Sequence, residues 1–405
     1  MTAGSRTVTF LFIGIAIAYF ERVGISLAMQ ALSAELELTV AQEGIIFSAF
    51  SLGYVASMIP SSYLIFRLGA GRVFYLSVLA SSLLAFTQSL AGSFSSLLLI
   101  RFLLGVAEAP LFPACAAVIK GSITPERRLG ASAFFDSGSY VGAALTGPLI
   151  VWLVSSHGWR TAFSAQLLFV ALWLALWFAF RSSCSHAQLE GHLENRAQAF
   201  RELVQSRHVW IAGAGFFLYN YCKAFFLTWL PLMLLRQKGY EFVRLGFFSA
   251  IPFVFAFAAE NLVANFADRI IRRNIRRFGQ VRRAIFFGGF SLASLIGCLP
   301  FTSGLATDVT LISLAFSGLI ATSGAIWSLP ADLCRTEGST ALFGAIQNTI
   351  SNCGGIAAPL VIAFFVTADG DYSLAVLSVA VASLIAMVIY GILLPAPKLE
   401  TQPMS

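Results

Sequence analysis

The sequence predicts an all-α polytopic membrane protein with twelve transmembrane helices arranged as two six-helix bundles. Three observations predict this fold class: the apolar composition, the length of the apolar runs and the placement of the basic residues. Of the 405 residues, 58% are hydrophobic and only 11% are charged, and the mean hydropathy is +0.81. A soluble domain carries about 25% charged residues, so this composition excludes a disordered chain and almost any soluble enzyme. The apolar runs are too long and continuous for the alternating strands of a membrane barrel.

Each predicted span is an apolar run of roughly 20 residues, the length that crosses a bilayer as a helix. The first six lie near 8–31, 43–66, 72–93, 95–120, 129–154 and 159–181, and the second six near 208–235, 243–267, 283–303, 307–331, 339–367 and 372–394. The polar segment 182–207 separates them. It predicts an N-terminal bundle over 1–181, a cytoplasmic linker and a C-terminal bundle over 208–405.

The basic residues predict the orientation, because cytoplasmic loops are enriched in Lys and Arg. With a cytoplasmic N-terminus, the outer loops hold Arg160, Arg236, Lys238 and Arg244, the spans hold Arg22, Arg101 and Lys223, and all the other Lys and Arg residues lie inside. This asymmetry supports twelve crossings with both termini cytoplasmic. The densest basic run, 269–283, is explained by a short cytoplasmic loop, and a nucleic-acid or lipid patch is the alternative.

Four ionisable residues in the first half predict a site, because a charge at membrane depth is costly. Glu21 and Arg22 are adjacent and diverge by about 100° around a helix, so each needs a partner on another helix or a water-filled cavity. Arg101 and Glu108 are seven residues apart and share one helix face. An arginine can hold a carboxylate through two hydrogen bonds, and a buried carboxylate can take up a proton. The alternative is a buried structural ion-pair network.

Other polar residues within the spans are candidates with two interpretations each. Lys223, near the middle of the seventh span, lines a cavity or extends toward the membrane surface. Asp136 and Glu260 lie near the inner ends of the fifth and eighth spans, as gate or interface residues or as ordinary polar contacts. Asn348 and Asn352 are four apart on one helix face, which suits either hydroxyl recognition or helix–helix contact.

No motif for chemistry occurs in the sequence. The six cysteines are scattered without metal-ligand spacing, and no phosphate-binding loop or protease motif is present. We therefore expect neither a metal nor a cofactor, and no enzymatic activity.

Several stretches resemble the anion:cation symporter family of the major facilitator superfamily. The segment YFERVGISLAMQ (19–30) is similar to the family's Tyr-x-Asp-Arg-x-x-x-x-x-Ala signature. The others are RFLLGVAEAPLFPA (101–114), YNYCKAFFLTWLPLMLL (219–235), IWSLPADL (326–333) and FGAIQNTISNCGGIAAP (343–359). The resemblance extends over nearly the whole chain.

The resemblance implies two bundles related by pseudo-two-fold symmetry, and a monomeric carrier in a bacterial inner membrane. Such a carrier imports a small organic anion, for example a sugar acid, together with protons by alternating access, and it does not bind nucleic acid. The implied substrate-binding residues are Arg22, Arg101, Tyr19, Tyr54, Lys223, Tyr221, Trp327, Asn348 and Asn352, and the implied proton-coupling residues are Glu21 and Glu108.

The sequence departs from the family pattern at several positions. Glu21 stands where the family usually has Asp, and Lys223 where an apolar residue is usual. The superfamily's Gly-x-x-x-Asp-Arg motif lacks its aspartate at 62–67, while Asp268 and Arg269 retain the inner-gate pair in the second half. An exporter or anion exchanger would use the same scaffold, and a transporter-like sensor that does not transport is a further alternative.

Overall fold

The computed structural model describes residues 3–123, 125–180, 196–274, 277–334, 337–367 and 369–394. Within these ranges the chain forms helices joined by short turns and contains no strand, so the predicted all-α class is confirmed. The predicted linker is described only from residue 196 onward, and its remaining residues lie outside the described ranges.

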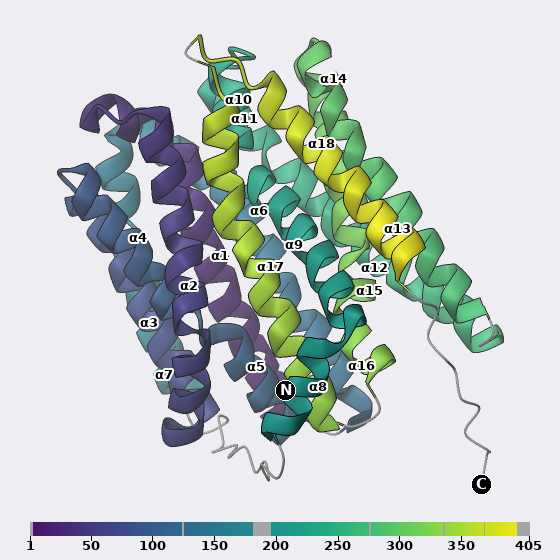
Figure 1. The fold of residues 1–405 in the computed structure, drawn as a ribbon. Helices are drawn as coiled ribbons and strands as arrows, with labels where there is room; N and C mark the ends of the chain where they lie inside the picture. Colours follow the sequence, from purple (N-terminus) through teal and green to yellow (C-terminus); the bar gives the residue numbers. More distant parts are fainter. Residues whose placement is uncertain are drawn as a thin grey trace, which may run out of the picture. The chain divides into compact units, whose positions relative to one another are not determined.

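The helices follow one another with few intervening residues (Figure 1). In the first half they are α1 (Ala3–Leu36), α2 (Val40–Leu68), α3 (Ala70–Thr87), η1 (Gln88–Leu90), α4 (Phe94–Glu108), α5 (Leu111–Ser122), α6 (Pro125–Ser164) and α7 (Leu167–Phe180). In the second half they are α8 (Arg196–Gln205), α9 (Arg207–Thr228), α10 (Leu230–Arg236), α11 (Phe242–Phe248), α12 (Ala250–Arg273), α13 (Phe278–Ser294), η4 (Leu295–Phe301), α14 (Leu305–Ala321), α15 (Ser323–Trp327), α16 (Leu329–Leu333), α17 (Glu337–Phe365), α18 (Ser373–Val388) and η5 (Ile389–Leu393).

Ten helical segments in the described residues are long and apolar enough to cross a membrane. The other two predicted spans, 159–181 and 208–235, correspond to shorter or interrupted helices. The first of these contains the apolar helix Leu167–Leu176, and the second is divided between α9 and α10.

Several predicted spans are interrupted where glycine or proline occurs. The fourth span is divided into α4 and α5 around Pro110, because proline cannot donate a backbone hydrogen bond. Gly158 has φ 80° and ψ 165°, a conformation that glycine adopts readily, and it bends the helical segment between the fifth and sixth spans. The division at Pro110 makes Glu108 the last residue of α4.

The described residues divide into two compact units. One contains those of Met1–Gly191 together with Ala224–Val254 and Ile356–Ala375, and the other contains those of His192–Lys223, Phe255–Gly355 and Val376–Ser405. The helices α9, α12, α17 and α18 are therefore divided between the two units. The predicted division into domains at 182–207 stays a prediction.

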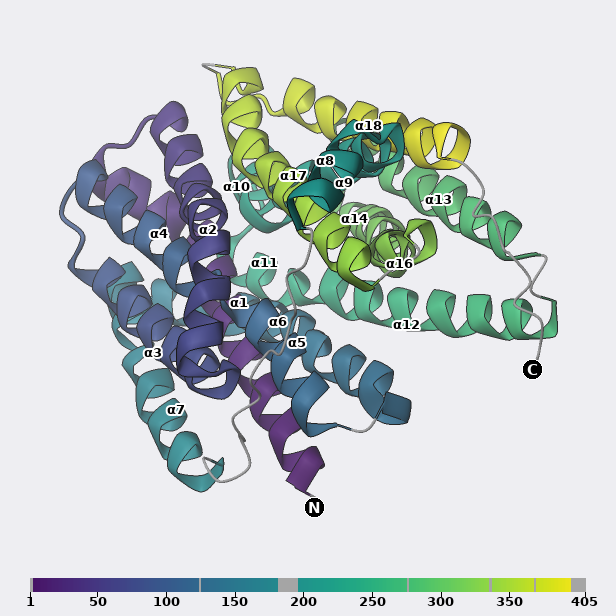
Figure 2. The same ribbon diagram turned by 60° about the horizontal axis from the view of Figure 1, so that its bottom comes forward.

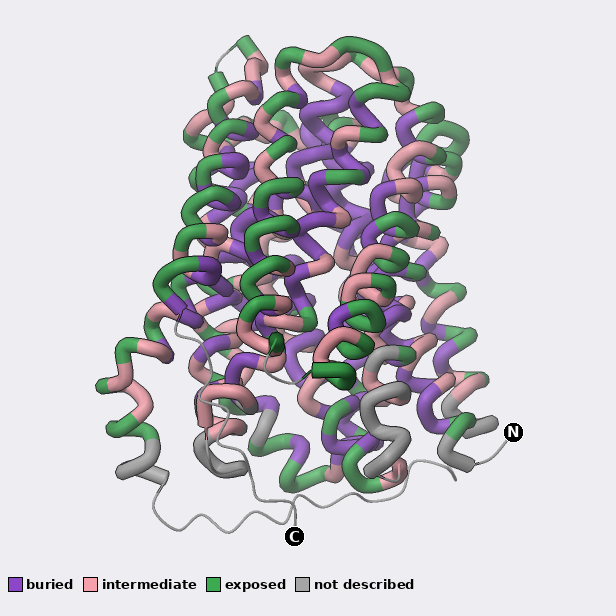
Figure 3. The backbone as a smooth tube through the Cα atoms, turned by 90° about the vertical axis from the view of Figure 1, so that its right-hand side faces the viewer, coloured by how far each residue is buried: buried purple, intermediate pink, exposed green. Residues whose placement is uncertain are grey.

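An aromatic cluster occupies the core of the first unit. The rings of Phe10 and Trp173 stack at 4.3 Å between centroids, and Phe74 meets Trp173 edge-on at 5.8 Å. These residues join α1, α3 and α7, and all three side chains are fully buried. Around most helices, buried and exposed residues alternate along the tube (Figure 3), as expected of helices with one packed face.

The helices α2 and α4 approach each other at two glycines. A Cβ at Gly53 would meet the carbonyl oxygen of Phe102, and a Cβ at Gly105 would meet the carbonyl oxygen of Phe50. The missing side chains therefore permit backbone contact between the helices. This contact places Phe50 and Tyr54 of α2 against α4.

A buried ion pair holds Ala224–Val254 within the first unit. Both terminal nitrogens of Arg236 donate to Glu43, at 2.8 and 2.5 Å, and Ser33 donates to the same carboxylate at 2.5 Å. A longer hydrogen bond of 3.4 Å joins Arg236 to the Tyr372 hydroxyl. Only 1% of the Glu43 side chain is exposed, so its charge depends on these donors.

Further contacts secure the same segments. The Ser48 hydroxyl donates to the Ile356 carbonyl oxygen at 2.7 Å, which attaches α17 to α2. The Phe47 and Trp229 rings pack edge-on at 5.4 Å. The first unit is therefore completed by chain segments from the second half of the sequence.

The second unit has its own aromatic core between α13 and η5, which continues directly from α18 (Figure 2 shows α13 and α18). Phe286 stacks on Tyr390 at 4.7 Å, and the Tyr390 hydroxyl donates to the Ala212 carbonyl oxygen at 2.8 Å. A Cβ at Gly289 would meet the Thr322 side chain and the Gly318 carbonyl oxygen, so α13 and α14 also meet at small residues.

Replacing Gly105 should disrupt the α2–α4 contact. We expect Gly105→Ala to lower the stability of the purified protein by more than about 2 kcal/mol, because the added methyl group would overlap the α2 backbone. Thermal unfolding in detergent measures the effect. Gly288→Ala is the matched control, since nothing lies within 4 Å of its added Cβ. Equal melting temperatures for both variants would contradict the close approach.

Removing Arg236 should leave the buried Glu43 carboxylate without its charged partner. We expect Arg236→Ala to destabilise the protein by about 3 kcal/mol, and Glu43→Gln combined with Arg236→Ala to cost less than the sum of the two single changes. Arg244→Ala breaks an exposed ion pair with Glu241 and should cost below about 1 kcal/mol. Additive effects in the thermal unfolding of the four Glu43 and Arg236 combinations would refute the coupling.

Candidate functional site

The structure brings together the four charged site residues that were predicted in the first and fourth spans. Two of the predicted tyrosines lie beside them. They are Tyr19, Glu21 and Arg22 of α1, Tyr54 of α2, and Arg101 and Glu108 of α4. All belong to the first compact unit. Tyr19, Glu21, Tyr54, Arg101 and Glu108 are buried, and Arg22 is partly exposed.

Arg22 and Glu108 form the central ion pair of this site. Arg22 donates from Nε at 3.1 Å and from Nη2 at 2.5 Å, in both cases to Oε2 of Glu108. The Glu108 side chain has no exposed surface, while 18% of the Arg22 side chain is exposed. The other carboxylate oxygen of Glu108 is buried without a hydrogen-bond partner. Glu108 therefore retains one oxygen that could take up a proton or accept a hydrogen bond.

Phe50 lies against both guanidinium groups. The guanidinium carbon of Arg22 is 4.6 Å from the centre of the Phe50 ring, and that of Arg101 is 5.0 Å from it. Arg22 is also 4.6 Å from the Tyr19 ring and 5.7 Å from the Tyr54 ring. The rings attract both cations and shield them from bulk water. Sequence reasoning missed Phe50 because an apolar residue in a span carries no distinguishing signal.

Arg101 has unused hydrogen-bonding capacity. Its Nε and Nη1 atoms are buried and have no hydrogen-bond partner, although the residue is only 2% exposed. Buried donors without acceptors are costly, and a guanidinium offers adjacent donors that match a carboxylate. Arg101 is therefore the side chain of this site that is best arranged to accept an added anion.

Glu21 points to a different partner from its neighbour Arg22. One of its oxygens accepts a hydrogen bond of 2.5 Å from the Ser82 hydroxyl of α3, and the other is buried without a partner. Glu21 and Arg22 thus each have a partner on another helix, which was one of the two predicted alternatives. Ser82 was not predicted, although a pair of serines, Ser81 and Ser82, interrupts the apolar third span.

The predicted residues of the second half form separate contacts within the second unit. Asn352 donates to the side-chain and backbone oxygens of Asn348 at 3.0 and 2.8 Å, which confirms that the two amides share a helix face. Trp327 is 55% exposed and packs edge-on against Phe216 at 5.1 Å. The Tyr221 hydroxyl is 2.8 Å from Ser378 Oγ. Lys223 is half-buried in α9.

The predicted gate residues are distributed between the two units. Asp136 is half-buried in α6 of the first unit. In the second unit, Glu260 accepts a hydrogen bond from Ser323, the kind of ordinary polar contact that was the alternative interpretation. Asp268 and Arg269 are exposed near the end of α12.

One ion pair in the second unit escaped the sequence reasoning. Arg282 was counted among the loop residues, but it is buried and donates to Asp332 at 3.2 Å. Ser328 donates to the same carboxylate at 3.0 Å. Burial raises the pKa of Asp332, although both of these partners act in the opposite direction.

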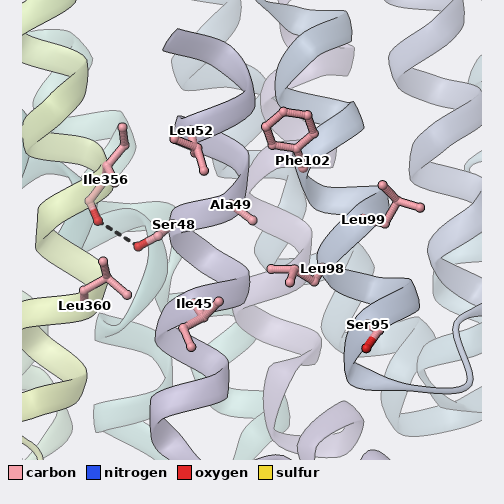
Figure 4. A pocket seen from close by; sticks show the side chains of 10 residues that line it. All are labelled: Ile45, Ser48, Ala49, Leu52, Ser95, Leu98, Leu99, Phe102, Ile356 and Leu360. Atoms are coloured by element: carbon pink, nitrogen blue, oxygen red, sulfur yellow. Dashed lines mark hydrogen bonds between the residues drawn. The ribbon is translucent and has the colours of Figure 1, made fainter. Parts of the chain in front are cut away.

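A separate apolar pocket of about 480 Å³ lies in the first unit (Figure 4). Its walls come from α2, α4 and the Ile356–Leu360 part of α17, and the Ser48–Ile356 hydrogen bond crosses one side. The lining residues are Ile45, Ser48, Ala49, Leu52, Ser95, Leu98, Leu99, Phe102, Ile356 and Leu360. It contains no charged side chain and does not suit a small anion. Among the described residues, no group of three or more His, Cys, Asp or Glu could hold a metal.

The chain is similar to several curated transporters along most of its length. It is 30% identical to the probable galactarate/D-glucarate transporter GarP of Escherichia coli (strain K12), over 94% of this chain and 92% of that protein. It is 30% identical to the probable sulfoacetate transporter SauU of Cupriavidus necator, over 88% and 86% respectively. The hexuronate transporter of Bacillus subtilis (strain 168) is 26% identical, over 90% and 89%.

Solved structures show the same fold. A bacterial homologue of the human lysosomal transporter Spinster aligns with a TM-score of 0.74 at 16% identity, covering 96% of this chain and 97% of that one. The nucleoside transporter NupG aligns with a TM-score of 0.72 at 13% identity, covering 95% and 98%. These likenesses confirm the predicted fold.

The family model described as Major Facilitator Superfamily matches residues 11–351. Together with the relatives, it supports the predicted assignment to a transport protein and not an enzyme. This chain, a multi-pass membrane transporter, belongs to the Major Facilitator Superfamily.

Proposed function

We propose that this protein is a proton-coupled symporter that imports a small organic anion by alternating access. The observation that carries the proposal is the arrangement of Arg22, Arg101 and Glu108. One buried arginine has unused donors, and the other is occupied by a buried carboxylate with one unpaired oxygen. An anion and a proton can therefore both bind at this site. The anion can bind at the unused donors of Arg101, and the proton can bind at the unpaired oxygen of Glu108.

The coupling follows from competition for Arg22. While Glu108 is ionised, its carboxylate occupies the Nε and Nη2 donors of Arg22. A proton that binds to Glu108 removes the negative charge and weakens this pair. Arg22 then becomes available to a substrate carboxylate that also accepts hydrogen bonds from Arg101. Binding of the proton thus favours binding of the anion, and loss of the proton restores the ion pair and favours release of the anion.

Glu21 provides a second carboxylate for proton coupling. It is held by Ser82 instead of an arginine, so a proton on Glu21 would not need to displace a cation. We place Tyr19 and Tyr54 at the wall of the anion site because their rings lie against Arg22. From the second unit, Lys223, Tyr221, Trp327, Asn348 and Asn352 are proposed to complete substrate recognition.

The Glu43–Arg236 pair is proposed to close the outer side. With a cytoplasmic N-terminus, the first residues of α2 and the end of α10 lie at the outer surface. Arg236 and the Ile356 segment are packed against the first six helices there. Opening to the outside would have to separate these contacts, so their stability would influence the population of the outward-open state. Asp136, Glu260, Asp268 and Arg269 are proposed for the inner side.

The proposed substrate class is a small acid with at least one carboxylate or sulfonate group. Two arginines within one site favour an anion that presents oxygens to adjacent guanidinium donors. The relatives' names describe carriers of galactarate, D-glucarate, sulfoacetate and hexuronate, and all of these are organic acids. Hydroxyl groups on the substrate would find amide partners at Asn348 and Asn352.

Transport in proteoliposomes tests the coupling. We expect an inward proton gradient to drive accumulation of at least one member of a panel of hydroxy acids, dicarboxylates and sulfonates. Glu108→Gln should abolish gradient-driven accumulation while allowing exchange across the membrane, because the neutral side chain mimics the protonated state. No uptake of any anion under the gradient would refute symport. Accumulation only under an outward gradient would indicate export, and exchange without gradient dependence would indicate an antiporter.

Substitution of Arg101 tests the anion assignment independently. We expect Arg101→Ala to reduce anion binding at least tenfold, a loss of about 1.4 kcal/mol or more, because a charge-assisted hydrogen bond contributes about 1.5–3 kcal/mol. Isothermal titration of the purified protein with the anion identified by transport measures this. The control is Arg244→Gln, an exposed arginine of α11. Unchanged affinity in Arg101→Ala would remove this residue from the substrate site.

A further inference from the structure

One exposed side of the helix α12 changes in character along its length. Leu262, Phe266, Arg269 and Arg273 are separated by four, three and four residues, so they lie along one stripe of the helix. Leu262 is 69% exposed, Phe266 is 66% exposed, and both arginines are exposed. We name these four residues the α12 stripe. It changes from apolar to cationic over about 16 Å, at 1.5 Å per residue.

Other polar side chains of α12 form hydrogen bonds within the second unit or to their own helix. Glu260 accepts a hydrogen bond from Ser323. Asn261 and Asn265 donate to the carbonyl oxygens of Phe257 and Asn261, each at 2.8 Å. Glu260 therefore lies on the far side of the helix from Leu262, whereas Asn265 is four residues before Arg269 and flanks the cationic end of the α12 stripe. The apolar part of the stripe suits hydrocarbon.

Asp268 and Arg269 are adjacent in sequence but occupy different faces. Neighbouring positions differ by about 100° around a helix, which places Asp268 on the side of Asn261 and Arg269 on the α12 stripe. The resemblance implied that both residues serve the inner gate. Their placement separates them around the helix, and of the two only Arg269 lies on the α12 stripe.

More positive charge follows the cationic end of the stripe. Arg272 is exposed in the last turn of α12, and Arg277 and Arg283 are exposed at the start of α13. Arg282 differs because it is buried and paired with Asp332. These exposed arginines lie at the ends of α12 and α13 that flank the predicted cytoplasmic loop. A bilayer surface with anionic phospholipids complements such a juxtamembrane cluster.

We propose that the α12 stripe is a binding site for an anionic phospholipid of the inner leaflet. Arg269 and Arg273 bind the phosphate of the head group, and Leu262 and Phe266 contact an acyl chain. Two features favour a lipid over a nucleic acid. The apolar and cationic residues are continuous along one helix face, and the apolar residues belong to a predicted membrane span. A nucleic acid would use the charges but leave the apolar half of the stripe without a partner.

Native mass spectrometry of the delipidated full-length protein tests this site. The protein is titrated with phosphatidylglycerol or with phosphatidylcholine of the same acyl chains, and dissociation constants are obtained from the populations of lipid-bound species. We expect the Arg269→Gln, Arg273→Gln double variant to lose about 30-fold of the preference for phosphatidylglycerol. That factor corresponds to about 1 kcal/mol for each arginine. Arg244→Gln, an exposed arginine on the predicted outer side, should retain the preference.

Two more arms separate the contributions of charge and hydrocarbon. Arg269→Lys with Arg273→Lys should keep most of the preference, which also shows that the site tolerates substitution without loss of folding. Leu262→Ala with Phe266→Ala should weaken binding of both lipids by similar factors. An unchanged preference in the glutamine variant, or an equal loss in Arg244→Gln, would overturn the proposal. Competition by glycerol phosphate or a short oligonucleotide at lipid-equivalent concentrations would also overturn it, because a lipid site requires the acyl chain.

Discussion

The ion pair between Arg22 and Glu108 is the constraint on which the N-terminal site depends. A guanidinium and a carboxylate inside predicted membrane spans are tolerated only where they meet, so α1 and α4 must be oriented to bring them together. Phe50 of α2 can reach both arginines because α2 and α4 touch at Gly53 and Gly105. Helix packing and site electrostatics are therefore two aspects of one arrangement.

The same physical rule operates at other places in the fold with different consequences. Glu43 and Arg236 are paired where chain segments distant in sequence meet, and Arg282 and Asp332 are paired within the second unit. These two pairs have additional hydroxyl donors that satisfy their carboxylates. The N-terminal site instead retains unpaired atoms on Glu21, Arg101 and Glu108. A saturated pair suits a structural contact, while unsatisfied buried donors and acceptors suit a site that binds something else.

Sequence reasoning identified most of the N-terminal cluster because its members are exceptions to the local composition. Glu21, Arg22, Arg101 and Glu108 are charged residues in apolar runs, and their cost in a membrane makes them recognisable individually. Phe50 and Ser82 were missed, since a phenylalanine or a serine in an apolar span is unremarkable. Arg282 was misassigned to a loop because the boundary of α13 was expected at 283 instead of Phe278.

The sequence alone determined the all-α class, the placement of most spans and the identity of the buried charges in the N-terminal site. These properties depend on hydropathy and on the cost of burying charge, and both are evaluated residue by residue along the chain. Only the tertiary structure decided that Arg22 pairs with Glu108, that Glu21 accepts a hydrogen bond from Ser82 and that Arg101 keeps unused donors. Such pairings depend on how each helix is rotated and where helices cross, and these are set by contacts between residues far apart in the sequence.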